Sequence, residues 1–241
     1  MNADVIKYVV LAVVFVGLLM RLKPTIEGRN NSIFIALALM FLGIALSIES
    51  IYLVVDGTLG GHNYANLVIR FVVFIAFLIF GVKMAKAFSA PWAGWLIVGP
   101  VGLVVLGACA VLAIVFFVMS DLPQSSVGLH DYGNQELVQW YGRVGRIYPA
   151  YVAACLIVPA ATCALSSSAA AFTRTAAAFL AAAFSIMTCY EIGRELWLVH
   201  GIWDVILPFG AAFLLAVGLI LFVVARYSAQ RTKRPKALPD C

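Results

Sequence analysis

The amino-acid sequence predicts an all-α membrane protein, a bundle of seven transmembrane helices with the N-terminus outside and the C-terminus in the cytoplasm. Of its 241 residues, 64% are hydrophobic and 11% are charged, whereas a soluble domain carries roughly 25% charged residues. The mean hydropathy is +1.03. Apolar stretches reach about 18 residues or more, enough to span a hydrocarbon core of about 30 Å as a helix. The run 98–119 does not alternate in polarity, as strands of a membrane β-barrel do.

Seven segments have the length and composition of a membrane span. They make up a transmembrane domain over residues 1–227, and the remaining residues, 228–241, are basic and carry two prolines. We expect this last segment to be a disordered cytoplasmic tail, because polar chain ends without packing partners are poorly ordered. The expected spans are residues 5–22, 32–55, 65–87, 92–119, 138–165, 169–194 and 203–226.

The orientation follows from the side on which lysine and arginine gather. Eleven of the 16 basic residues lie in the connections 21–31 and 83–91, at Arg174, or at and beyond Arg226. Nine of the 11 acidic residues lie on the opposite side. Cytoplasmic connections carry an excess of lysine and arginine, so the basic side is expected to be the cytoplasmic one. The basic tail should also contact anionic lipid.

Several functional classes find no support in the sequence. The five cysteines form no CxxC motif and none lies in an outer connection, so neither a disulfide framework nor a zinc site is indicated. His62, His130 and His200 fall in three separate connections without the paired spacing of a metal motif. A retinal Schiff base would need a lysine within 203–226, and that segment has none. We expect no enzyme activity, no metal, no cofactor and no nucleic-acid partner.

Ionisable residues within the expected spans gather in the outer half of the bundle. A charged side chain inside a membrane is costly and usually faces protein or water, so each one is a candidate site. Spacings of three, four or seven residues place them on shared helical faces, and together they could border one external vestibule. The candidate ligand-binding residues are Glu49, Arg70, Arg143, Arg146, Tyr190, Glu191 and Arg194.

Two further expectations concern the arrangement of these residues. Glu49 and Arg70 lie at similar depth on helices joined by the short connection 57–64, and we expect them to pair or to share a ligand. We also expect the principal cavity to be an outer vestibule bordered by the charged members of the candidate set. The alternative is that these side chains reach the headgroups and pair among themselves. Whether they face a common cavity or each other distinguishes the two.

Three stretches carry a resemblance to a known family. They are RLKPTIEGRN at 21–30, LGGHNYANLVIRFVVFIAFL at 59–78 and WYGRVGRIYPAYVA at 140–153. In these stretches the chain resembles an actinobacterial family of seven-helix integral membrane proteins, described as transporters or membrane proteins of unknown substrate. The resemblance implies a seven-helix bundle in a bacterial plasma membrane. It transfers no functional residue, because none is assigned in the family.

The sequence therefore predicts a polytopic plasma-membrane protein that binds a small polar or charged solute through an outer vestibule, as a transporter or a receptor-like sensor. The alternative is a non-catalytic scaffold or accessory subunit of a larger membrane complex, in which polar residues only hold helices together. The expected partners are the lipid bilayer, an unidentified solute and, in the alternative, another membrane protein.

Overall fold

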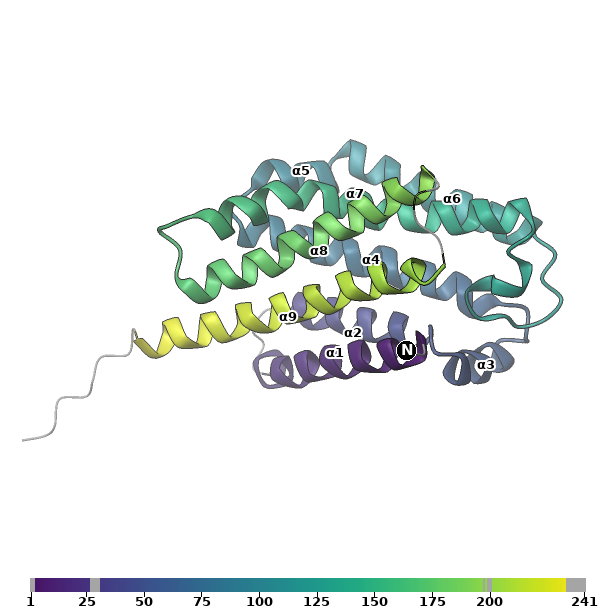
Figure 1. Ribbon diagram of the computed structural model, residues 1–241, viewed down its shortest axis with the longest axis horizontal. Helices are drawn as coiled ribbons and strands as arrows, with labels where there is room; N and C mark the ends of the chain where they lie inside the picture. Colours follow the sequence, from purple (N-terminus) through teal and green to yellow (C-terminus); the bar gives the residue numbers. More distant parts are fainter. Residues whose placement is uncertain (1–2, 27–30, 197, 199–200, 233–241) are drawn as a thin grey trace, which may run out of the picture.

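Helices account for all the secondary structure in the residues that the computed structural model describes, which are 3–26, 31–196, 198 and 201–232 (Figure 1). Apolar segments in a bilayer must satisfy their backbone polar groups internally, and a helix does so within one segment. In chain order the elements are α1 (Ala3–Ile26), α2 (Asn31–Ala45), α3 (Glu49–Thr58), α4 (Tyr64–Ala87), α5 (Pro91–Val98), α6 (Pro100–Met119), the 3₁₀ helix η1 (Val127–Tyr132), α7 (Glu136–Leu165), α8 (Ala171–Glu195) and α9 (Trp203–Thr232).

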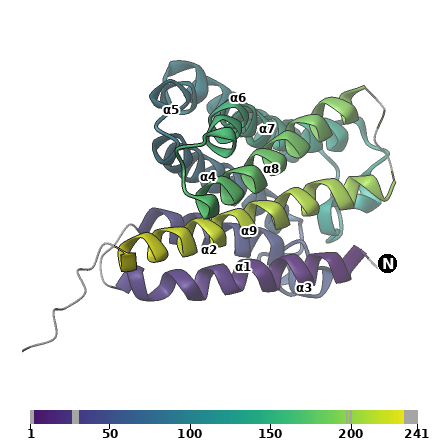
Figure 2. The ribbon, with the colours of Figure 1, turned by 60° about the vertical axis from the view of Figure 1, so that its left-hand side comes forward.

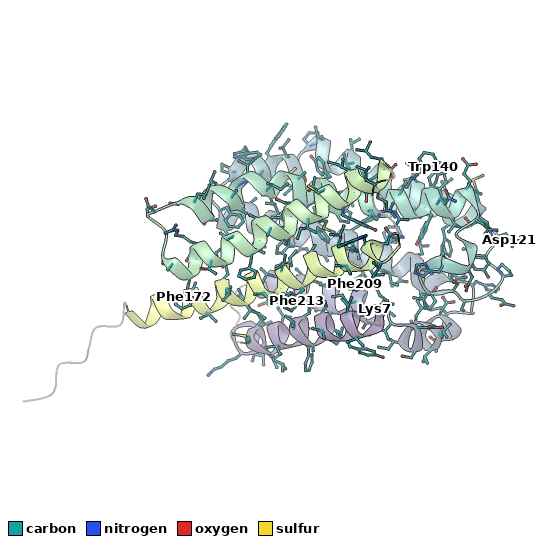
Figure 3. All side chains as sticks on the ribbon, in the orientation of Figure 1. Lys7, Asp121, Trp140, Phe172, Phe209 and Phe213 are labelled. Carbon is teal, nitrogen blue, oxygen red and sulfur yellow. The ribbon has the colours of Figure 1, made fainter. Side chains whose placement is uncertain are left out.

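Among the described residues, six helical segments are long and apolar enough to cross a membrane, or seven if α2 and α3 count as one bent span. Their outer surfaces are apolar too. Val104 and Val118 on α6 are 69% and 73% exposed, and Trp140 and Phe172 are exposed on α7 and α8 (Figure 3). The all-helical prediction is confirmed, and these helices fit a polytopic membrane protein. The count of seven spans and the orientation stay predictions.

The two ends of the bundle differ in chemistry. The end that holds α3, η1 and the start of α9, at the right of Figure 1, is called the polar end below. The opposite end holds the turn between α7 and α8 and the last part of α9. Because α9 continues to Thr232, it extends past residue 228, where the sequence predicts a disordered tail. Residues 233–241, the rest of that expected tail, lie outside the described residues.

The helices pack as neighbouring pairs. α2 packs on α4, α8 packs on both α7 and α9, and α1 packs on both α2 and α9 (Figure 2). Aromatic contacts tie the pairs together: the rings of Phe80 and Phe184 lie 5.9 Å apart between α4 and α8. The rings of Phe74 and Tyr148 lie 5.8 Å apart between α4 and α7. Offset and edge-to-face aromatic pairs add to the stabilisation from burial, so α4 is anchored on two sides.

Prolines interrupt two of the expected spans. Pro100 disfavours a helical conformation at the residue before it, and Gly99 is accordingly extended (φ −74°, ψ −178°) between α5 and α6. Inside α7, Pro149 and Pro159 remove two backbone donors. Each proline leaves the carbonyl four residues earlier without its helical partner. Helical structure covers the expected spans 92–119 and 138–165, and that these segments cross a membrane stays a prediction.

The expected span 32–55 is broken in the structure. α2 ends at Ala45 and α3 begins at Glu49, and the two axes differ in direction by 96°. Ile48, between them, is extended (φ −89°, ψ 124°). The Ser47 hydroxyl donates to the Gly43 carbonyl over 2.8 Å, which occupies a carbonyl near the end of α2. The prediction of one continuous helix over this segment is wrong.

A buried carboxylate accounts for the position of α3. Asp56 is fully buried and accepts hydrogen bonds from the backbone N–H groups of Asn63 and Ala65, each at 2.9 Å. Ala65 belongs to the first turn of α4, so Asp56 satisfies a donor that the helix itself leaves open. Its negative charge also lies at the positive end of the α4 dipole. The turn between the two helices places Asn63 in the left-handed region (φ 62°), which asparagine tolerates better than most residues.

The same turn is tied to the long loop before η1. The Tyr52 hydroxyl donates to Asn63 Oδ1 over 3.0 Å, and Asn66 Nδ2 donates to the Tyr52 hydroxyl over 2.6 Å. Asn66 also donates to the Ser126 carbonyl, and the Ser126 N–H donates to Asn63 Oδ1. Together with Asp56 these residues form the polar-end network. All five are buried and hydrogen-bonded, which rigidifies the end of the bundle.

Replacing Asp56 with alanine should lower the free energy of unfolding by about 3 kcal/mol, because two buried backbone donors lose their acceptor. The change should appear as a lower midpoint in thermal or denaturant unfolding of the purified protein in detergent. Asp121→Ala is the matched control, since Asp121 is an exposed acid at the same end (Figure 3). Equal effects of the two changes would contradict the role assigned to Asp56.

Candidate functional site

Two ion pairs join α7 to α8 at the polar end. Arg146 Nε lies 2.9 Å from Glu191 Oε2, and Arg143 Nε lies 3.5 Å from Glu195 Oε1. The first pair is the more buried, with side-chain exposures of 22% and 11%, whereas the Glu195 side chain is 45% exposed. The Arg143 guanidinium also lies 4.7 Å from the centre of the Trp140 ring. A partly buried pair resists screening by solvent better than an exposed one.

A third ion pair joins α8 to α9. The guanidinium of Arg194 pairs with the carboxylate of Asp204 in the first turn of α9. The Tyr190 hydroxyl donates to the same carboxylate oxygen over 3.3 Å, and Arg194 also donates to that hydroxyl over 3.4 Å. Tyr190 and Arg194 are four residues apart on one helical face. The three side chains therefore act as a single contact between the two helices.

Five of the seven residues predicted from sequence come together in this region: Arg143, Arg146, Tyr190, Glu191 and Arg194. Their carboxylates and guanidiniums face each other, which is the arrangement expected if they hold helices together. Two of the partners, Glu195 and Asp204, were not in the candidate set. The signal that could have found them is their place at the facing ends of consecutive helices, where opposite charges meet.

Glu49 does not pair with Arg70, so the prediction that the two form a pair is wrong, and a shared ligand stays a prediction. Glu49 is exposed in the first turn of α3, and no ion pair or hydrogen bond joins it to another described residue. The physical reason is the 96° bend before α3. Because of this bend, Glu49 does not lie at the depth in the bundle that it would have in one continuous helix. An acidic side chain at a helix N-terminus is instead stabilised by the helix dipole.

Arg70 lies against α7 instead. Its guanidinium is 4.9 Å from the centre of the Tyr141 ring, a distance at which a cation is attracted to an aromatic face. It also lies over Gly145, where a Cβ atom would come within 2.5 Å of the guanidinium. Gly145 thus provides the space that the arginine fills. Sequence reasoning singled out Arg70 but not this contact.

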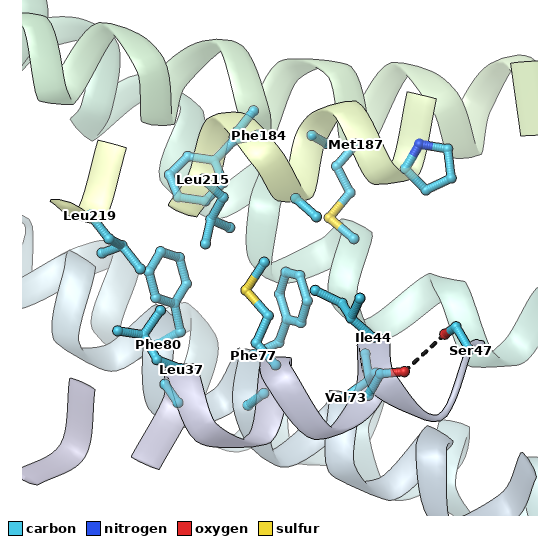
Figure 4. Close-up of a pocket in the computed structure, with 18 of the residues that line it drawn as sticks. Leu37, Ile44, Ser47, Val73, Phe77, Phe80, Phe184, Met187, Leu215 and Leu219 are labelled. Carbon is cyan, nitrogen blue, oxygen red and sulfur yellow. Dashed lines mark hydrogen bonds between the residues drawn. The ribbon is translucent and has the colours of Figure 1, made fainter. Parts of the chain in front are cut away.

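A cavity of about 200 Å³ separates the α2–α4 pair from the α8–α9 pair (Figure 4). Its walls are almost wholly apolar. Figure 4 shows Phe77, Phe80 and Phe184 around it, with Met187 on the α8 side. The one hydroxyl in its lining belongs to Ser47, and that hydroxyl already donates a hydrogen bond to the Gly43 carbonyl of α2. No member of the predicted site lines this cavity, so it is not the polar vestibule expected from the sequence.

Three of the four lining helices contribute residues at the same spacing. Positions i, i+4, i+7 and i+11 of a helix form one stripe along its surface. Small residues such as Ala76 and Ala212 within these stripes leave volume unfilled between the facing helices. The stripes are Ala36, Met40 and Gly43 on α2, continued by Ser47 just after it; Ile69, Val73, Ala76 and Phe80 on α4; and Pro208, Ala212, Leu215 and Leu219 on α9.

Among the described residues, no group of three or more histidine, cysteine or acidic side chains is placed to hold a metal ion. His200 lies outside those residues. Comparison of the chain with protein-family models, with curated proteins and with solved structures finds no match. The resemblance to an actinobacterial family stays a prediction.

Replacing Arg146 or Glu191 with glutamine should each lower the free energy of unfolding by about 3 kcal/mol, because the partner charge is left unpaired in a partly buried place. The double change should cost less than the sum of the two. Thermal or denaturant unfolding in detergent measures the effect. Glu195→Gln is the control, because an exposed pair is worth about 1 kcal/mol or less. Strictly additive effects of Arg146→Gln and Glu191→Gln would show that the pair does not interact.

Proposed function

We propose that the protein is a multi-pass membrane receptor or carrier that binds the hydrocarbon chain of a lipid between the α2–α4 and α8–α9 pairs. The observation that carries the proposal is the cavity of about 200 Å³ lined by three parallel apolar stripes. Its one lining hydroxyl already has a partner, so no polar group is offered to a ligand. Apolar pockets of this kind favour apolar ligands, since burying an unpaired polar group costs free energy.

The length of the cavity supports a lipid chain as the occupant. Each stripe covers eleven residue steps, as from Ile69 to Phe80 on α4. At 1.5 Å per residue that is about 16 Å, or roughly half of a hydrocarbon core of about 30 Å. A cavity that long matches one leaflet of the bilayer. An acyl chain of the polar-end leaflet could fill it with its headgroup near Ser47 and Pro208.

The structure gives less support to a small charged solute as the ligand. Such a solute would need free charges, and three of the candidate arginines are paired with carboxylates. An ion in the apolar cavity would also lose its hydration without replacement. The proposal therefore keeps the receptor or transport role expected from the sequence and changes the class of ligand.

A second candidate function is a scaffold or accessory subunit of a larger membrane complex. The ion pairs favour it, because Arg146–Glu191 and Arg194–Asp204 link α7, α8 and α9 directly. Polar contacts help to hold helices together in a bilayer, where the hydrophobic effect does not draw helices together. In that function the cavity would be a packing defect and would hold no particular lipid.

Ala212→Phe should reduce lipid retention roughly tenfold, because a bulky ring in a lining stripe occupies the space of the chain. The measurement is native mass spectrometry of the protein released from nanodiscs that contain a single phospholipid. Ala182→Phe is the control, since Ala182 is exposed on α8 and does not line the cavity. We expect one retained lipid for the wild-type protein and for the control.

Equal retention by wild-type protein and Ala212→Phe would contradict the proposal and favour the scaffold. Loss of retention by both variants would assign the effect to a general change in the surface of the bundle, and would also contradict it. The melting temperature of each variant shows that the comparison is made between folded proteins.

A further inference from the structure

The apolar cavity is closed at one of its two ends. Figure 4 shows Leu37, Phe80 and Leu219 together at that end, which is called the floor below. Ser47 lies at the other end. The three floor side chains are at most 5% exposed. The rings of Phe80 and Phe184 lie 5.9 Å apart, so α4 and α8 are in direct contact at the floor.

The helices stay in contact beyond the floor. Met84, one turn past Phe80 on α4, is 2% exposed. Further along, the rings of Phe88, just after α4, and Phe222 on α9 lie 5.8 Å apart. Protein interiors are close-packed, with few voids larger than a water molecule. A hydrocarbon chain in the cavity therefore finds no continuation past the floor.

The opposite end of the cavity is the more accessible one, and it is called the mouth below. Ser47, Ile69 and Pro208 line it, and each is only half-buried. The wall that α2 provides stops there, because α3 turns away by 96°. Ser47 also supplies the one hydroxyl among the described lining residues. Polar side-chain chemistry within the cavity is therefore confined to the mouth.

A cavity of this shape suits a linear amphiphile that is polar at one end only. A polar group at the floor would have no hydrogen-bond partner, which costs free energy, so the apolar end of the ligand must occupy the floor. A chain that stops short leaves a void and loses packing contacts. A chain that is too long must overpack the floor or leave part of itself outside.

We infer that Phe80 sets the length of the hydrocarbon chain that the cavity binds. This inference rests on the proposed lipid binding and adds a selectivity for chain length to it. Phe80 is the largest of the three floor side chains, and its contact with Phe184 keeps the ring from turning aside. Because it closes the α4 stripe that begins at Ile69, its ring limits how far a chain extends along α4.

The test is native mass spectrometry of the purified protein in detergent, with an equimolar mixture of lauroyl, myristoyl, palmitoyl and stearoyl lysophosphatidylcholine. The four probes share one headgroup, so differences in retention report the chain alone. We expect the wild-type protein to retain stearoyl less than a shorter chain. Phe80→Ala should raise the ratio of stearoyl to lauroyl retention roughly tenfold, because a longer chain fills the space that the truncation opens.

A second variant changes the floor in the opposite direction. Ala36→Leu adds volume beside Leu37 in the lining, so it should lower the ratio of stearoyl to lauroyl retention. It keeps the test decisive if Phe80→Ala fails to fold. Phe74→Ala is the matched control, since Phe74 is also buried on α4 but packs against Tyr148 of α7 and does not line the cavity. It should keep the wild-type ratio.

The outcomes separate this inference from the proposed function. If the wild-type protein retains none of the four probes, the proposed lipid binding fails and the inference fails with it. If the wild-type protein retains them but neither floor variant changes the ratio, only the inference is overturned. An equal shift in Phe80→Ala and Phe74→Ala would overturn it as well. Opposite shifts in the two floor variants, with none in the control, would support it.

Discussion

The buried carboxylate of Asp56 positions the polar groups of this protein. It binds two backbone donors of the turn between α3 and α4, and it is buried without an ion-pair partner among the described residues. Such a charge is tolerated only where several hydrogen bonds replace its hydration. The chain between the two helices must therefore fold back around Asp56. As a result α3 turns across the end of the bundle, and the first turn of α4 is fixed.

Fixing the start of α4 also fixes the depth of the groups that follow it. Asn66 belongs to the polar-end network, and Arg70 lies one helical turn further along. From Ile69 onwards, one face of α4 is apolar and lines the cavity. The change from a satisfied polar network to an apolar wall thus occurs within about two turns of one helix. This sharp boundary separates the polar-end network from the apolar cavity.

The all-helical class and nearly all helix positions could be predicted from the sequence, because the length and apolar composition of each segment are local properties. The bend before Glu49 could not be predicted from the sequence. It depends on backbone hydrogen-bond donors that follow it in the chain and on the loop at Ser126. Helical spacing predicted the cluster around Glu191 because the polar residues stand out against apolar neighbours. The residues that line the cavity do not differ in polarity from their neighbours in this way. Residues on all sides of α2 and α9 are apolar, so stripes that line a cavity resemble those that face lipid.

The two prolines of α7 have a mechanical consequence. Pro149 and Pro159 interrupt the hydrogen-bond ladder of a helix that carries Arg146 near one end and contacts α4, α6 and α8 along its length. A helix whose ladder is interrupted bends at lower energetic cost than a continuous one. α7 is therefore built as stiff segments joined by compliant joints, with its polar-end segment fastened to α8. Bending strain applied to the bundle would be taken up at those joints, and the fastened end would keep its geometry.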